Sequence, residues 1–80
     1  MLTNKTLYSL VEIEKLLKKT GKEGKILEEL MKLNALDDKI EVNKVTSEKF
    51  KLLLPDIVDK MRGNLEAELI ISDLNNKFDT

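Results

Sequence analysis

Residues 50–78 read FKLLLPDIVDKMRGNLEAELIISDLNNKF, and the spacing of apolar residues in this stretch decides the fold. Apolar side chains recur at three- and four-residue steps through both Pro55 and Gly63, which is the period of an amphipathic helix. The pattern predicts helical structure over residues 47–78, in which Pro55 either kinks one long helix or takes the first position of a new helix. A further break is possible at Gly63, and in that case Asn64 would cap the last helix. The phase is set by Phe50, Leu54, Ile57, Val58, Met61, Leu65 and Leu69.

This C-terminal segment is apolar around more of its circumference than one small core can cover. Because a helix cannot turn three consecutive side chains to one side, the run 52–54 predicts that Leu53 faces away from Leu54 and Ile57. The run 69–71 supports the same argument. We therefore expect the segment to be enclosed on several faces, by its own domain or by another subunit. The predicted partner contacts in it are Leu53, Ile57, Met61, Leu65, Leu69, Ile71, Leu74 and Phe78.

The N-terminal half predicts two further helices that lie side by side. The first covers residues 6–19, with Thr6 as its N-cap and Thr20-Gly21 at its end, because glycine adopts the left-handed conformation that closes a helix. The second covers residues 25–36. The connection between them is short, as in a helical hairpin.

Between these two halves, the helical period is lost. Residues 39–45 alternate apolar and polar side chains, which predicts an extended connector and allows one short strand at 39–43. Thr46 is predicted to be the N-cap of the following helix, with Val45 and Phe50 forming a hydrophobic staple. The predicted architecture is an all-α domain spanning residues 1–80, a small bundle of three to four helices with a long C-terminal helical segment.

The composition removes most catalytic and metal-binding side chains. The chain has no histidine, cysteine or tryptophan, so it lacks the groups that titrate near neutral pH, the reactive thiolate and the usual nitrogen and sulfur metal ligands. Acidic pairs at 37–38 and at Asp56 and Asp59 lack the alternating oxygen ligands of a calcium loop. We therefore expect no catalytic residue, no bound metal and no cofactor.

The charges balance, and no segment is apolar enough to enter a membrane. Fourteen basic and fifteen acidic residues give a formal net charge of -1, which disfavours generic binding to DNA. The longest apolar run has three residues, so we expect neither a signal region nor a membrane span. The absence of cysteine is typical of a reducing compartment, and we expect a cytoplasmic protein. Thirteen lysines against Arg62 alone are typical of an A+T-rich genome, such as that of a low-GC bacterium or its phages.

One local motif suggests contact with nucleic acid. Gly21-Lys22-Glu23-Gly24 lies between two predicted helices and precedes the extended stretch 39–42, an order that resembles the core of a KH domain. The resemblance implies that a single-stranded nucleic acid would contact Gly21, Lys22, Gly24 and Lys25. Residues 8–17 also resemble the first helix of MerR-like DNA-binding domains, which would make the helix from Lys25 a recognition helix. The alternative interpretation is a helix end followed by a helix start, both of which favour glycine.

The sequence therefore favours a non-enzymatic protein-binding role, with a nucleic-acid-binding module as the alternative. The partner would be another protein, a second copy of the chain, or both, because an unstapled chain of this length buries a small core. Tyr8 is predicted to lie on the polar side of the first helix, where an aromatic ring has no core to enter, and it is the remaining predicted contact.

Overall fold

A computed structural model describes residues 4–36 and 40–79 of the chain, and its regular elements there are all helical. They are α1 (Asn4–Leu17), α2 (Glu23–Ala35), α3 (Lys44–Lys60) and α4 (Leu65–Phe78). Within those residues the structure contains four helices and no strand, which confirms the predicted all-α fold.

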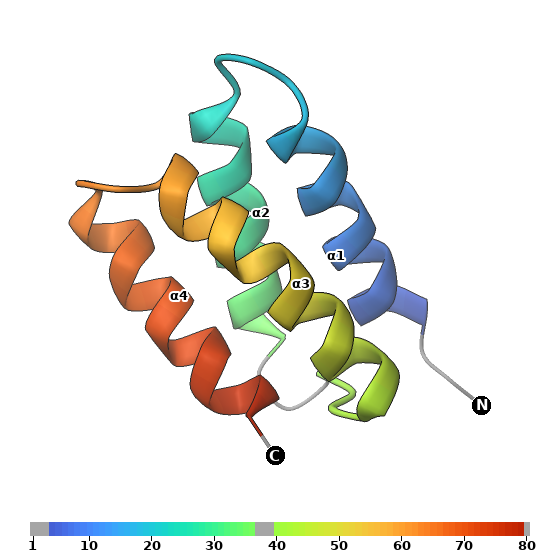
Figure 1. The fold of residues 1–80 in the computed structure, drawn as a ribbon. Coiled ribbons are helices and arrows are strands. Elements are labelled where there is room, and N and C mark those ends of the chain that lie inside the picture. The colour runs from blue at the N-terminus through green and yellow to red at the C-terminus, as the bar shows by residue number, and fades with distance from the viewer. Residues whose placement is uncertain (1–3, 37–39, 80) are drawn as a thin grey trace.

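The helices form two antiparallel hairpins that pack on each other (Figure 1). The chain ascends α1 and returns along α2, then ascends α3 and returns along α4. Helix α3 packs beside α1, and α4 packs beside α2, so each helix contacts its hairpin partner and one helix of the other pair. The C-terminal helix therefore has α2 on one flank and α3 on the other.

All four helices contribute to one apolar core, which includes a pair of aromatic rings. Phe50 of α3 and Phe78 of α4 are stacked, with ring centroids 4.8 Å apart and an interplanar angle of 19°. Offset stacking of this kind is the favourable arrangement of two aromatic rings. The other buried apolar residues are Leu10, Ile13, Ile26, Leu30, Leu33, Leu53, Ile57, Met61, Ala67, Ile71 and Leu74.

The predicted orientation of Leu53 was wrong. Its side chain is 5% exposed and lies in the core with Ile57, whereas Leu52 is the outward residue, at 75% exposure. Leu54 is half-buried at the edge of the core. The buried stripe of α3 thus runs through Phe50, Leu53 and Ile57 at steps of three and four, and Leu54 lies on its flank.

Helix α3 begins with a capping box, and its N-cap lies three residues before Thr46, the predicted N-cap. Asn43 is the N-cap, and its Oδ1 accepts a hydrogen bond from the Thr46 amide at 3.0 Å. The Thr46 hydroxyl oxygen in turn accepts one from the Asn43 amide, also at 3.0 Å. The predicted staple was also wrong, because Val45 is exposed while Phe50 is buried.

The connector before α3 is held by two buried threonines. The Glu41 amide donates to Thr6 Oγ1 of α1 at 3.4 Å, and the Glu41 carbonyl accepts from Thr46 Oγ1 of α3 at 2.7 Å. These bonds satisfy both backbone groups of Glu41 and tie the connector to α1 and α3. Thr6 was predicted as an N-cap, but it lies inside α1, which begins at Asn4. The described part of the connector, 40–43, forms no strand, and Lys39 lies outside the described residues.

The C-terminal segment is divided into two helices near Gly63. Helix α3 continues through Pro55 to Lys60, and Gly63 then adopts a φ of +89°. Asn64 caps α4 as predicted, with its Oδ1 accepting from the Ala67 amide at 3.1 Å. Because this turn reverses the chain, α4 packs back against α3 as its antiparallel neighbour.

Two polar contacts join the hairpins. Lys49 Nζ of α3 lies 2.9 Å from Glu14 Oε1 of α1, and this hydrogen bond lowers the pKa of the Glu14 carboxyl below its ordinary value. Lys77 Nζ of α4 lies 2.7 Å from Asn34 Oδ1 of α2. Both contacts join helices of opposite hairpins, so they fix how one hairpin is aligned along the other.

Replacing Gly63 and Gly24 by alanine should change stability in opposite directions. A Cβ at either position would meet no atom within 4 Å, so only the backbone conformation differs. Gly63 has a positive φ, and Gly63→Ala is expected to lower the free energy of unfolding by about 1–2 kcal/mol. Gly24 lies in the first turn of α2, where Gly24→Ala is expected to raise it by about 0.5–1 kcal/mol. Urea unfolding of both variants tests this, and equal shifts would contradict it.

Candidate protein-binding surface

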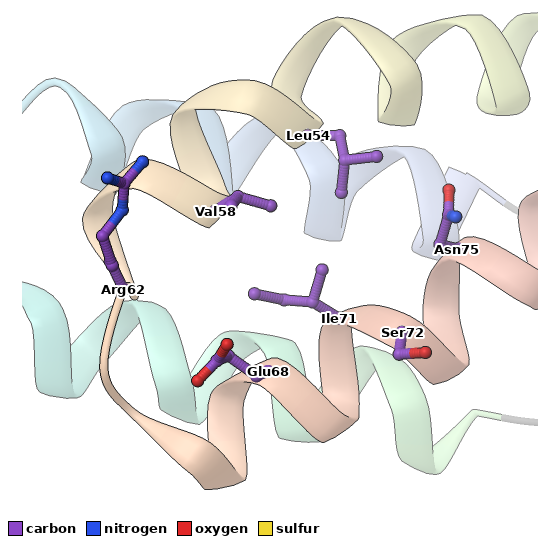
Figure 2. Close-up of a pocket in the computed structure, with 7 residues that line it drawn as sticks. All are labelled: Leu54, Val58, Arg62, Glu68, Ile71, Ser72 and Asn75. Carbon is purple, nitrogen blue, oxygen red and sulfur yellow. The ribbon is translucent and has the colours of Figure 1, made fainter.

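An open groove runs between α3 and α4 (Figure 2). Its volume is about 340 Å3. One wall comes from Leu54 and Val58 of α3, one helical turn apart, and from Arg62 in the turn that follows this helix. The other wall comes from α4, through Glu68, Ile71, Ser72 and Asn75.

The middle of the groove is apolar and its ends are polar. In Figure 2 the side chains of Leu54 and Val58 face Ile71 across the groove. Ile71 is buried and Leu54 half-buried, whereas Val58 is exposed. Arg62 and Glu68 lie at one end and Asn75 at the other. The groove therefore offers an apolar surface flanked by hydrogen-bonding and charged groups, which is typical of small interaction sites.

The outward side of α4 carries two further exposed leucines. Leu65 and Leu69 are one turn apart, and both are largely exposed. Leu69 also lines a second, shallower depression of about 390 Å3 on the α2 side of α4, together with the half-buried Ile70. We call the groove and the outward side of α4 together the α4 face; its apolar residues are Leu54, Val58, Leu65, Leu69, Ile70 and Ile71.

The structure separates the nine predicted contact residues into two groups. Three are exposed: Leu65 and Leu69 on α4, and Tyr8 on α1, outside the α4 face. The other six fill the core of the chain and give little or no accessible surface to a partner, except that Ile71 forms the floor of the groove. These six are Leu53, Ile57, Met61, Ile71, Leu74 and Phe78.

Sequence reasoning did not single out the groove residues Arg62, Glu68, Ser72 and Asn75. Polar residues on a helix give no signal of their own, because any exposed position accepts them. The spacing of Leu54 and Val58 was recognised, but it was assigned to the buried stripe. Leu54 and Val58 lie on the side of α3 that faces α4. The spacing within one helix does not show which helix packs against that side.

The glycine loop has the conformation expected of a helix connection. Gly21 has a φ of +73°, which is the left-handed geometry that ends a helix, and Gly24 already lies inside α2. Lys22 and Lys25 are exposed on either side of Gly24. Since the described residues form no strand, the structure gives no support to the resemblance to a KH domain.

Comparisons with protein-family models, with curated proteins and with solved structures give no match. Across the helices that the structure describes, none has the length and apolarity needed to cross a membrane. Nor do acidic side chains gather, within the described residues, in a group of three or more that could hold a metal ion.

Proposed function

We propose that this chain is a non-enzymatic protein-binding module that takes a helical segment of a partner protein onto the α4 face. The observation that carries the proposal is the position of Leu65 and Leu69. Both are exposed leucines of α4, and Leu69 lines the depression that adjoins the apolar-floored groove at Ser72. Exposed apolar residues that lie together beside a concavity are typical of interaction sites, whereas single scattered ones are not.

The shape of the groove suits a helix. Helix α4 has 14 residues and is therefore about 21 Å long, so a partner helix of three or four turns could lie along it. Amphipathic helices bind in such grooves through apolar side chains spaced at three and four residues. In this arrangement, one partner side chain would enter between Val58 and Ile71, and others would cover Leu65 and Leu69. The polar ends of the groove would fix the orientation of the helix.

Such a module would act by occupying or recruiting its partner. We propose that it serves as a small regulatory, inhibitory or assembly subunit, because the α4 face is suited to binding another protein. The described residues offer no group of side chains suited to a metal, and the sequence lacks histidine and cysteine. These features favour binding over catalysis.

Leu69→Lys is expected to weaken binding of a peptide to the α4 face by about tenfold or more. The bound peptide would bury Leu69, and burial of a leucine side chain contributes about 1.5–3 kcal/mol to the free energy of binding. The probe is a neutral helical peptide of leucine and glutamine, with leucines at three- and four-residue steps. Its affinity is measured by fluorescence anisotropy, and its site is mapped by changes in the amide shifts of the labelled protein. For the wild type, these changes should be confined to α3 and α4.

Leu52→Lys is the matched control. Leu52 is 75% exposed and Leu69 is 73% exposed, so the two substitutions add the same charge at equally accessible leucines. Leu52 lies on the outward side of α3, away from the groove, and its replacement should leave the affinity unchanged. If both variants lost affinity equally, or if the wild type bound no neutral peptide, the proposed function would be wrong. Thermal melts establish that both variants are folded.

A further inference from the structure

The exposed polar residues of α4 carry an excess of negative charge. Glu66, Glu68 and Asp73 are all exposed on this helix, and Lys77 is its one basic residue. Glu68 also lines the groove between α3 and α4. The apolar residues of the α4 face are therefore bordered by carboxylates.

Lys77 does little to offset these carboxylates at the surface. Its side chain is 21% exposed, and its Nζ lies 2.7 Å from Asn34 Oδ1 and 3.4 Å from Asp73 Oδ2. The ammonium group thus takes part in the contact between α4 and α2. It partly neutralises Asp73 but leaves Glu66 and Glu68 without a basic neighbour on their own helix.

The α3 wall of the groove is close to neutral. Arg62, in the turn after α3, is the only basic residue among those that line the groove, and its guanidinium lies 3.7 Å from the Asp59 carboxylate of α3. Both side chains are highly exposed, so this pair is weak and solvated. Arg62 and Asp59 offset one another, and α4 carries an excess of carboxylates, so the α4 face has a net negative charge.

From this charge distribution we infer that the partner helix is basic and amphipathic, with lysine or arginine beside its apolar stripe. The inference rests on the proposed function and adds the charge of the partner to it. Complementary charges at the border of an interface steer association and disfavour wrong partners. A basic helix would place its cations over Glu66 and Glu68 while its apolar residues cover Leu65 and Leu69.

The same charges disfavour a second copy of this chain as the occupant. In a symmetric dimer through the α4 face, the same patch meets itself, so two acidic helices would be brought together. Glu66, Glu68 and Asp73 of one copy would then lie near those of the other. Like charges across an interface are unfavourable, and the partner is accordingly a different protein.

The test compares two charged versions of the neutral leucine and glutamine peptide, in which lysine or glutamate replaces glutamine. The lysine peptide should bind about tenfold tighter than the glutamate peptide at low salt. Each exposed ion pair at the border of the interface adds little to the free energy of binding, but several such pairs together produce this difference. This difference should shrink as salt rises, since exposed charges are screened. Glu66→Gln with Glu68→Gln should remove most of the difference.

Glu23→Gln with Glu48→Gln is the matched control, because both glutamates are exposed and lie on α2 and α3. This double variant changes the net charge equally and should preserve the difference between the peptides. Equal affinity for the two charged peptides, equal behaviour of the two double variants, or a dimer through α4 at micromolar concentration would each overturn the inference. Binding of the neutral peptide decides the proposed function separately, so the two failures are distinguishable.

Discussion

Phe78→Ala is expected to lower the free energy of unfolding by about 3–5 kcal/mol. Phe78 is the last residue of α4, yet its side chain is buried and stacks on Phe50 of α3. Truncation would remove the aromatic pair and leave a cavity where α3 and α4 meet. The total stability of a chain of this length is about 4–12 kcal/mol, so the substitution should remove a large share of it.

Urea unfolding followed by circular dichroism measures this loss, with Leu65→Ala as the control on the same helix. Leu65 is exposed, and its truncation should change stability by less than about 0.5 kcal/mol. A double-mutant cycle with Phe50→Leu and Phe78→Leu keeps most of the core volume and isolates the ring contact. Its coupling energy should be about 0.5–1.5 kcal/mol. A loss below 1 kcal/mol for Phe78→Ala would show that the end of α4 frays and that the stack is not formed.

The existence of the helices could be predicted from side-chain spacing, but the phase of α3 could not. Phe50 and Ile57 can be joined by a step through Leu53 or by a step through Leu54, and both steps fit the helical period. The choice depends on the directions from which α1 and α4 approach, which spacing within one helix does not reveal. The helix starts were misplaced for a similar reason, since Asn43 and Thr46 are both good N-cap residues.

The candidate site could be predicted only in part. The excess of apolar residues along the C-terminal segment indicated that some would remain outside the core, and Leu65 and Leu69 are indeed exposed. The groove itself arises where α3 and α4 lie side by side, so that Val58 faces Ile71. Such a pairing depends on the turn at Gly63 and on the packing of both hairpins.

Thr46→Val is expected to lower the free energy of unfolding by about 1–3 kcal/mol, because it removes two hydrogen bonds from partly buried backbone groups. The Thr46 hydroxyl donates to the Glu41 carbonyl at 2.7 Å and accepts from the Asn43 amide at 3.0 Å. Valine has nearly the same shape, so the packing of the buried side chain is retained while both hydrogen bonds are lost. The variant thus measures how strongly the connector is held to the start of α3.

Thr46→Ser keeps the hydroxyl and should recover most of this stability, whereas Thr20→Val, at an exposed threonine, should have no effect. Hydrogen exchange gives a local readout, since the Asn43 amide should exchange faster in Thr46→Val than in the wild type. Thr6→Val tests the other side of the same clamp, because Thr6 accepts from the Glu41 amide. If the two threonines hold one segment between α1 and α3, the losses in the double variant should not add. Strict additivity, or an unchanged exchange rate at Asn43, would mean that the connector is positioned by packing of the helices alone.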